Sequence, residues 1–263
     1  MALQANGDLL INGTGKVFIQ RLEAAGTAQG LKFLGQCTKL EASMNDEKLI
    51  EYSAVEASRA PIKEIVQRRT PQIGLTFKEF DRANFALAAM GSELSYTQAG
   101  TAVTNEVHAD VKQGTYIKLA KRGPITAVTV EPSGGGTAYT LGTDYVIEDD
   151  TVPLIYIVPG GGIADASDIQ VDYTPTAIVS GLDQVAAGTK SVIECALLYV
   201  PDLEAPGPAW QVEVWKASIT PEAAIGLIQA AAEFAAVDLR MTVLSDKTNH
   251  PTAPYWLATK IDS

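Results

Sequence analysis

Few residues of this chain combine the types and the spacing that chemistry requires. Gly13-Thr14-Gly15-Lys16 resembles the end of a phosphate-binding loop. However, Leu10 stands where the first glycine of such a loop belongs, and Val17 replaces the Ser or Thr that would hold magnesium. His108 and His250 are the only histidines, and neither has a Cys or a second His at the spacing of zinc ligands. We therefore expect no phosphate-loop chemistry and no structural zinc site.

The cysteines and the acidic residues also form no recognisable active site. Cys37 and Cys195 each lie in a predicted strand among apolar neighbours, which indicates buried free thiols; a disulfide or a reactive thiol is the alternative. Glu148-Asp149-Asp150 could bind calcium, although a solvated acidic turn is commoner for such a run. No pair of catalytic carboxylates stands out among the 31 acidic residues. The prediction is a protein that is not an enzyme, with no catalytic residue, metal or cofactor.

The element around which the chain is organised is a strand followed directly by a short helix, within Gln72–Gly91. Apolar residues alternate with others from Ile73 to Phe77, which is typical of a half-buried strand. Asp81 suits the N-cap of a helix, and Phe80 with Phe85 has the spacing of a hydrophobic staple. Phe85, Ala88 and Ala89 predict a narrow apolar helix face, which Leu87 and Met90 widen. Gly91 fits the left-handed position that ends a helix. Few other segments look helical, so we predict a mainly β protein with one short helix packed on its sheet.

Residues 43–71 are predominantly polar and predict a long hairpin arm. It runs outward through Leu49–Val55 and back through Ile62–Gln67, with a tip near Ala57–Ala60. An arm of this length cannot bury itself on its own core, so we expect it to order against another copy of the chain. A mobile, solvated loop is the alternative. The predicted subunit-interface residues are Val55, Glu56, Ala57, Ser58, Arg59, Ala60, Pro61, Ile62 and Lys63.

Residues 105–178 read as a compact module inserted into a first domain, which comprises residues 1–104 and 179–263. Ser92–Thr104, which precedes the module, has the composition of a linker. Glycine triplets at 134–136 and 160–162 predict turns between strands. Short strands separated by turns in this way indicate a small β-sandwich or barrel, and we take the module to be an immunoglobulin-like sandwich. Residues 106–178 carry four basic and ten acidic residues, 4 − 10 = −6. The five predicted strands of the module are Tyr116–Leu119, Ile125–Val130, Tyr145–Glu148, Leu154–Val158 and Ile169–Tyr173.

The closing part of the chain returns to the first domain. Ser191–Val200, Trp210–Ala217 and residues 237–244 read as strands. Trp210 and Trp215 fall on opposite faces, so this strand needs cover on both sides. Residues 222–230 stay open between helix and strand. The tail from Ser245 ends in Pro251, Pro254 and Trp256, which we expect to dock in a surface groove.

Composition excludes several classes of protein. The 263 residues are 46% hydrophobic, which is enough for a core, and contain no run of 18 apolar residues that could span a membrane. The N-terminus has no signal-peptide pattern, so we expect folding in a cytosol. A net charge of −11 disfavours tight binding of nucleic acid, but it suits a wall past which a polyanion must slide without sticking.

The order of these stretches resembles the major tail tube proteins of long-tailed (siphovirus-type) bacteriophages. GTGKVFIQRL followed by FLGQCTKLEASMNDEKLIEY is similar to the first strands and the start of the long hairpin in that family. TPQIGLTFKEFDRANFALAAMG is similar to the strand and the sheet-covering helix. GPITAVTVEPSGGGTAYTLGTDYVIEDD is similar to an accessory β-module, and WQVEVWKASITPEAA with VDLRMTVLSD to the closing strands. The Ala-rich stretch 223–236 departs from the family pattern.

The resemblance implies a structural virion protein with a tail-tube β-sandwich or barrel. Such proteins form hexameric rings that stack into a hollow tube, through whose lumen DNA passes without specific binding. The implied partners are further copies of the chain, a tape-measure protein, and tail terminator and tip proteins, with no membrane. The protein would be made in the host bacterial cytoplasm and reside in the virion tail. We expect the inserted module on the outer surface of the tube. The alternatives are the inner tube of a contractile tail or secretion-type apparatus, and an immunoglobulin-like surface binding protein.

Overall fold

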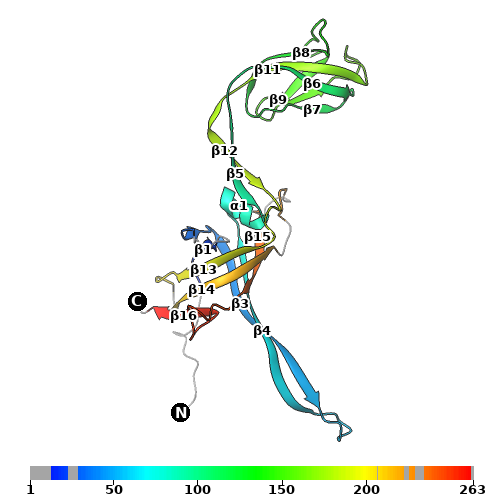
Figure 1. Cartoon of the computed structure of the whole chain (residues 1–263). Helices are drawn as coiled ribbons and strands as arrows, with labels where there is room; N and C mark the ends of the chain where they lie inside the picture. Colours follow the sequence, from blue (N-terminus) through cyan, green and yellow to red (C-terminus); the bar gives the residue numbers. More distant parts are fainter. Residues whose placement is uncertain (1–12, 23–28, 206, 222–224, 229–233, 262–263) are drawn as a thin grey trace. The chain divides into compact units, whose positions relative to one another are not determined.

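The computed structural model describes residues 13–22, 29–205, 207–221, 225–228 and 234–261. The chain divides into two compact units (Figure 1). Unit 1 comprises Met1–Glu93 and Val185–Ser263, and unit 2 comprises Leu94–Gln184. The sequence had placed these divisions after residues 104 and 178. The described residues form sixteen strands and one helix, so the prediction of a mainly β fold is confirmed.

Unit 1 is built on one large antiparallel sheet. The strand order is β2-β1-β13-β14-β15-β4-β3, and β16 pairs with β14 beside β15. Alternate residues of β4 and β15, such as Leu75 and Leu239, are buried in one core, where these two strands pair. This confirms the predicted alternation within Gln72–Gly91. The strands are β1 (Gly15–Leu22), β2 (Lys32–Phe33), β3 (Cys37–Tyr52), β4 (Pro61–Phe77), β13 (Ile193–Pro201), β14 (Ala209–Pro221), β15 (Val237–Val243) and β16 (Trp256–Ile261).

The tail of the chain covers one face of β14. The indole of Trp215 stacks on the ring of His250, with ring centroids 3.6 Å apart, and its Nε1 donates to the carbonyl oxygen of Ala253 at 2.8 Å. The sequence had predicted that this strand needs cover on both faces. It had also expected Trp256 in a groove, whereas Trp256 begins β16 and pairs with Val214. The end of the described chain is therefore held by strand pairing between β16 and β14, which the composition of the tail does not predict.

Helix α1 (Arg82–Ala88) begins as predicted. The carboxylate of Asp81 accepts a hydrogen bond from the backbone N–H of Asn84 at 2.8 Å, which is N-capping. The helix ends differently, because Met90 and not Gly91 takes the left-handed conformation, with φ of 47°. Gly91 N–H bonds to Ala86 O at 2.7 Å and Met90 N–H to Leu87 O at 3.3 Å, so the helix ends in a Schellman motif.

The face that α1 buries differs from the prediction only in part. Leu87 and Ala88 are buried as predicted, whereas Phe85 is only half-buried and Asn84, which was not predicted, is 1% exposed. The predicted face relied on apolar residues alone and therefore left out Asn84. The side-chain Nδ2 of Asn84 donates to the carbonyl oxygens of Leu34 at 3.1 Å and Glu79 at 3.0 Å, which allows its burial.

Unit 2 contains two three-stranded antiparallel sheets around one core. Their orders are β7-β10-β9 and β6-β11-β8, and apolar residues of both sheets join a single buried cluster that includes Val130, Ile155 and Val171. Each of the five predicted strands overlaps an observed one, but β6 was not predicted. The strands are β6 (Val103–Val111), β7 (Tyr116–Lys118), β8 (Ile125–Pro132), β9 (Tyr145–Asp149), β10 (Leu154–Ile157) and β11 (Ser167–Pro175).

Two further strands, β5 (Ser92–Gln98) and β12 (Ile178–Ala186), pair with each other. The prediction of a linker over Ser92–Thr104 is therefore wrong. Ser and Thr fit a strand when a partner satisfies their backbone groups, and that partner lies about eighty residues away in sequence. Residues 1–12 and most of 222–230, the stretch left open between helix and strand, fall outside the described residues. Among the described residues, no helix is long and apolar enough to cross a membrane.

Candidate interaction surface of the hairpin arm

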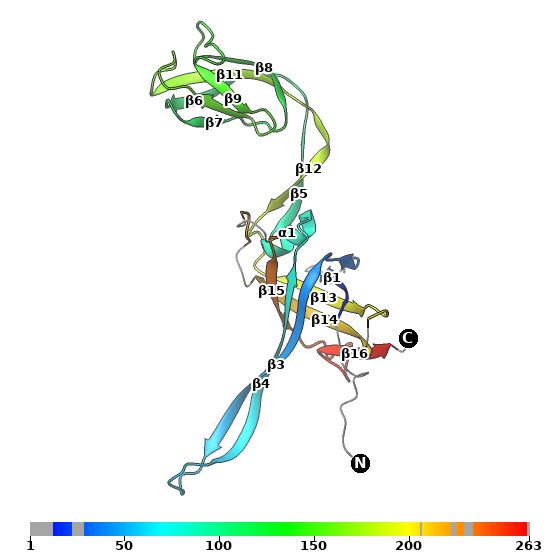
Figure 2. The same cartoon turned by 180° about the vertical axis from the view of Figure 1, so that it is seen from behind.

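The predicted arm is the outer half of two strands whose inner halves belong to the sheet of unit 1. β3 has 16 residues and β4 has 17, and they pair with each other from Cys37 and Phe77 to Tyr52 and Pro61. The first nine residues of β4 are all exposed, whereas burial alternates from Pro71 to Phe77. We call residues 43–71 the arm. Figures 1 and 2 show it projecting away from the rest of the sheet.

Residues 53–60 form the turn at the tip of the arm. The hydroxyl of Ser53 accepts from the N–H groups of Val55 at 3.3 Å and Glu56 at 3.2 Å, and Ser53 N–H donates to Ala60 O at 2.8 Å. Arg59 has a φ of 46° and its N–H donates to Glu56 O at 3.0 Å. The turn is therefore longer than the predicted tip at Ala57–Ala60, and Val55 belongs to the turn and not to the outgoing strand.

The predicted interface residues lie together at this tip. Val55 to Ala60 occupy the turn, and Pro61, Ile62 and Lys63 begin β4. All are exposed except Ala60, which is half-buried. Val55 is 96% exposed and Ile62 67% exposed, so both aliphatic side chains are accessible to a partner.

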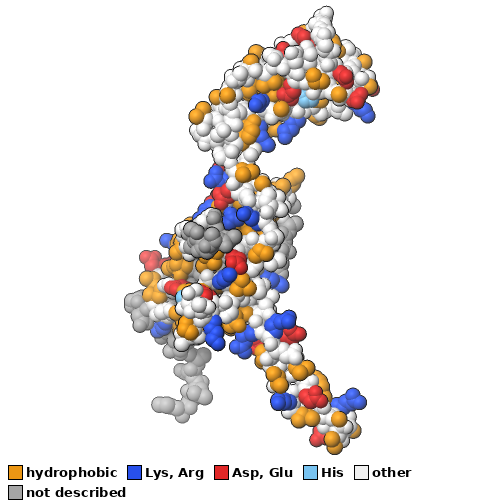
Figure 3. Space-filling view, viewed as in Figure 1, with side chains coloured by type: hydrophobic (Ala, Val, Ile, Leu, Met, Phe, Trp, Pro, Cys, Tyr) orange, Lys and Arg blue, Asp and Glu red, His pale blue; other side chains and the backbone are white. Residues whose placement is uncertain are grey.

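Exposed apolar residues continue along the paired strands of the arm before and after its tip, residues 43–52 and 64–71, which we call the stem. The prediction had placed no interface residues there. Leu49 and Ile65 are directly opposite each other across the two strands and are 51% and 46% exposed. Figure 3 shows hydrophobic side chains interspersed with charged ones on the arm. The signal was present in the sequence as single apolar residues inside a polar segment. The other exposed apolar side chains of the stem are Met44, Tyr52 and Val66.

Three ion pairs join six of the ten charged residues of the arm, and the third of them is Arg68 with Glu47 at 3.5 Å. Arg69 forms two hydrogen bonds to the Asp46 carboxylate, at 2.9 and 3.2 Å, and this contact lowers the pKa of that carboxyl. Lys48 lies 2.6 Å from Glu64, and this hydrogen bond raises the pKa of the lysine. Residues 43–69 contain five acidic and five basic residues, 5 − 5 = 0, in a chain of net charge −11. A partner that covered the arm would therefore meet no excess of charge.

Two β-bulges interrupt the pairing of the arm. The register shifts between Glu47 and Lys48 and again between Glu51 and Tyr52, so that β4 supplies an extra residue at each point. Bulges increase the local twist of a hairpin and discourage non-specific pairing of its edges. β3 is also the last strand of the sheet, so one of its edges has no partner strand among the described residues.

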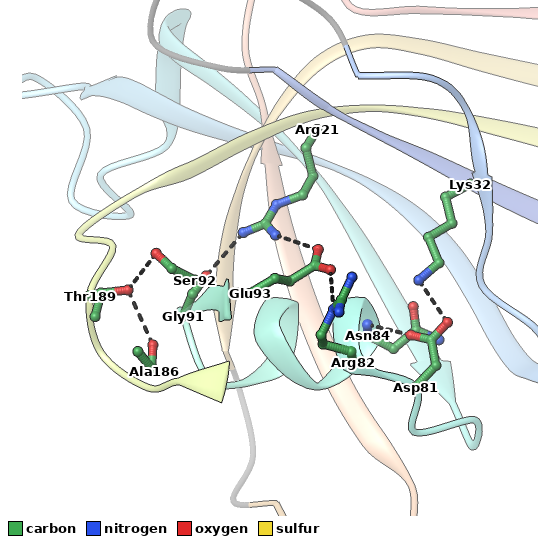
Figure 4. Close-up of polar contacts among 10 residues, drawn as sticks. All are labelled: Arg21, Lys32, Asp81, Arg82, Asn84, Gly91, Ser92, Glu93, Ala186 and Thr189. Atoms are coloured by element: carbon green, nitrogen blue, oxygen red, sulfur yellow. Dashed lines mark hydrogen bonds and ion pairs between the residues drawn. The ribbon is translucent and has the colours of Figure 1, made fainter. Parts of the chain in front are cut away.

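A polar joint holds the start of β5 and the helix on the sheet of unit 1 (Figure 4). Glu93 lies 3.5 Å from the guanidinium of Arg21 and 2.9 Å from that of Arg82. Arg21 also donates to the carbonyl oxygen of Gly91 at 3.1 Å, and Ser92 bonds to Thr189 at 2.8 Å. Each of these groups has a partner within the joint, which holds the helix and the start of β5 in position.

A groove of about 630 Å³ lies on unit 1, lined by residues from both ends of the sheet, including Val17, Phe33 and Leu40. Cys37 also lines it, and burial raises the pKa of that thiol to about 11. Burial raises the pKa of the Cys195 thiol to about 12. Both cysteines are free, as predicted, and both are held in the unreactive protonated form.

The remaining candidates from the sequence take structural positions. Gly15 begins β1 and lies against the backbone of Val200. His108 contacts Glu106 at 3.1 Å, and the Asp149 carboxylate accepts from the N–H groups of its own turn. Among the described residues, no three His, Cys, Asp or Glu side chains gather in a way that could hold a metal ion.

The geometry defines a mainly β protein of two units, with a self-neutralised hairpin arm as its most distinctive exposed surface. The chain also matches a known protein family. A family model described as "Protein of unknown function UCP028589" matches residues 10–254, so the chain belongs to that family. A search of curated proteins found no significant match.

Proposed function

We propose that the protein is the structural subunit of a bacteriophage tail tube of the long-tailed, siphovirus type. Copies of the chain associate into hexameric rings, and the rings stack into a hollow tube through which DNA is delivered. Its partners are other copies, a tape-measure protein, and the terminator and tip proteins of the tail. The proposal places the protein in the virion tail after its synthesis in the host cytoplasm.

The observation that carries this proposal is the arm. It exposes aliphatic side chains along both stem and tip, its net charge is zero, and three ion pairs join six of its ten charged residues. Burying one such side chain against a partner contributes about 1.5–3 kcal/mol, and a surface of zero net charge can be covered without an excess of charge of one sign. These features favour a surface that becomes ordered and dry on contact with another copy.

The sheet and the charge of the chain support the same proposal. β3 ends the sheet with an edge that has no partner strand within the described ranges, and a neighbouring copy could extend the sheet there. Six copies would carry 6 × −11 = −66, and acidic residues facing a lumen would repel DNA phosphates over a Debye length of about 8–10 Å. The DNA would then slide past the wall without binding.

Two alternatives draw on particular features. An inner tube of a contractile tail or secretion-type apparatus would use the same arm and sheet, and it differs by having a sheath bound outside. An immunoglobulin-like surface binding protein is favoured by the two small sheets of unit 2 around one core. It leaves the apolar arm without a role, so we rank it lower.

Negative-stain electron microscopy of the concentrated, purified protein tests the proposal. We expect hollow tubes or stacked rings of sixfold symmetry. A variant in which the arm is shortened between Val55 and Ile65 serves as the control, and it should stay folded and monomeric. Solitary particles of the unaltered chain at every protein and salt concentration would refute the proposed function, and normal tubes from the shortened variant would refute the role of the arm.

A further inference from the structure

The basic residues of unit 2 are confined to one short segment. Unit 2 has four basic and eleven acidic residues, 4 − 11 = −7, and all four basic residues lie between positions 112 and 122. Within the described chain, none of the four takes part in an ion pair. In unit 1, by contrast, basic residues commonly pair with acids, as Lys216 does with Glu194 at 2.9 Å. The four residues are Lys112, Lys118, Lys121 and Arg122.

The backbone that presents these charges is fixed. Three successive N–H groups each donate to a different side chain: Ala120 to Glu106 Oε1 at 2.9 Å, Lys121 to the Tyr173 hydroxyl at 3.2 Å, and Arg122 to Gln98 Oε1 at 3.1 Å. A segment held in this way loses little conformational freedom when its side chains bind a partner. We call Tyr116–Arg122, which contains three of the four basic residues, the basic strip; Lys112 lies just before it.

The same sheet carries an acidic turn at its other edge. Leu154 in the central strand β10 pairs with Lys118 of β7 on one side and with Asp149 of β9 on the other. Neighbouring strands are about 4.8 Å apart, so these two backbones are separated by about 10 Å. Lys118 and Asp149 form no ion pair within the described chain. What we call the acidic turn comprises Glu148 and Asp149, which end β9, and Asp150, which begins the turn after it. All three are exposed, and Val152 beside them is 50% exposed.

The two edges are therefore complementary to each other but not in contact within one molecule. The basic strip includes Tyr116, which is 54% exposed, so each edge combines charges that form no ion pair within the described chain with one exposed hydrophobic side chain. The guanidinium of Arg122 also lies over the ring of Tyr96, 5.4 Å from its centroid. Both β7 and β9 are edge strands of their sheet. Figure 3 shows Lys and Arg side chains along the side of unit 2 that carries β7, with acidic side chains elsewhere on the visible face.

We propose that unit 2 forms a head-to-tail contact between copies of the chain, in which the basic strip of one copy receives the Glu148–Asp150 turn of the next. Such a contact joins unlike surfaces, so it propagates from copy to copy and closes only in a ring. It rests on the proposed function in that it gives a ring of subunits a second, salt-sensitive connection. The arm then supplies apolar contact, and unit 2 supplies electrostatic selection of the neighbour.

Charge reversal on each edge tests the contact in the full chain. One variant carries Lys118→Glu and Lys121→Glu, and a second carries Glu148→Lys and Asp150→Lys. Asp149 is left in place because its carboxylate shapes the turn through the N–H groups of Thr151 and Val152. Sedimentation velocity over a series of salt concentrations measures self-association, and chemical unfolding checks that each variant keeps its fold.

Each reversed variant should self-associate about tenfold more weakly than the unaltered chain at low salt, because ion pairs become like-charge contacts. A 1:1 mixture of the two variants should recover association, since acidic strip meets basic turn and basic strip meets acidic turn in alternation. The chain with all four substitutions should recover it too. The matched control, Lys78→Glu with Lys247→Glu, makes the same charge change on unit 1 and should behave as the unaltered chain.

The outcomes separate this contact from the proposed function. If tubes form and both reversed variants associate as the unaltered chain does, the contact is refuted and the tube proposal stands. If no tubes form but the mixture recovers a salt-sensitive association, the contact stands and the tube proposal falls. If the chain with all four substitutions stays as weak as the Lys118 and Lys121 variant, the strip serves another anionic partner, such as an acidic polysaccharide, and the head-to-tail contact is refuted.

Discussion

Gly91 lies where the end of α1 meets β12. A Cβ atom at this position would lie 2.6 Å from the carbonyl oxygen of Ala186 and 2.9 Å from a methyl group of Val185. Replacing Gly91 with Ala should therefore lower the free energy of unfolding of unit 1 by about 1–3 kcal/mol, because backbone must shift to make room. Denaturant unfolding followed by tryptophan fluorescence measures this, since all three tryptophans belong to unit 1.

A second glycine supplies the matched control. Gly74 lies in β4, and a Cβ atom there would have no heavy atom within 4 Å. Gly74→Ala should leave stability unchanged or raise it by up to about 1 kcal/mol, because Ala restricts the unfolded chain. If both variants lost the same free energy of unfolding, close packing would not be the reason that position 91 requires glycine.

Asp144 gives unit 2 a pH dependence. Its carboxylate accepts from the N–H groups of Thr140 at 2.7 Å and Gly162 at 2.6 Å, and these bonds hold its pKa below the ordinary value of 3.8. A lowered folded-state pKa means that the stabilisation is complete above the unfolded pKa and is lost as the pH falls through the folded one. We expect the protection factor of the Gly162 amide in hydrogen exchange to fall in that range.

The Asp144→Asn variant is the comparison for this titration. An amide oxygen accepts a hydrogen bond but carries no charge, so protection of Gly162 should be weaker at neutral pH and nearly independent of acidification. If the Gly162 amide of Asp144→Asn still lost protection on acidification, the titration would belong to another carboxylate.

Residue patterns predicted α1 at its start better than at its end. Asp81 is an N-cap by residue type alone, and the structure bears this out. Gly91 was assigned to the left-handed position because glycine favours it, but Met90 takes that position. The glycine is required by an approach from β12, which is distant in sequence, and no local pattern reports such an approach. The burial of Asn84 was missed for the same reason, because its partners include Leu34.

At the scale of elements, the sequence predicted the arm and its turn but divided its strands. β4 shows period-2 alternation only from Pro71 to Phe77, where one face meets a core. Its outer half has no core to face, so its residues show no such alternation and read as a separate hairpin. β5 was missed because Ser and Thr suggest a linker, whereas pairing with β12 supplies the hydrogen bonds that make it a strand.

The stem of the arm allows a direct test of assembly against folding. Leu49 and Ile65 pair across the strands but remain about half exposed. Replacing both with Ser should change the stability of the monomer by no more than about 1 kcal/mol, since exposed substitutions usually matter little. The same change should abolish or strongly weaken polymerisation, because it removes the apolar area that a neighbour would cover.

Sedimentation velocity and unfolding curves, measured on the same samples, separate the two effects. Leu203→Ser serves as the control, because Leu203 is 53% exposed on unit 1 outside the arm. Polymerisation of the stem variant at the level of this control would remove the stem from the interface and leave the tip as the only candidate part of the arm.

At the scale of the whole molecule, each unit has a hydrophobic core of its own. The buried cluster of unit 1 includes Phe77 and Leu239, and that of unit 2 includes Ile155 and Val171, with no residue in common. Composition and turn signals were enough to suggest an inserted module, although not the strand pair β5 and β12 through which the chain enters and leaves it. The assembly itself depends on surfaces of other copies, which a single sequence does not describe.

Two separate cores predict that unit 1 folds and assembles without the inserted module. We expect a chain that lacks residues 99–177, with Gln98 joined to Ile178 by a short Gly-Ser linker, to keep the tryptophan unfolding transition within about 1 kcal/mol. At low salt it should still form tubes, with a smaller outer diameter, because the arm and the sheet edge remain. Its tubes should also lose the salt-sensitive share of association that the basic strip and acidic turn provide. Negative-stain microscopy at several salt concentrations measures diameter and assembly together. Complete loss of tubes from a folded deletion variant would place the module inside the essential interface and would contradict its position on the outer surface.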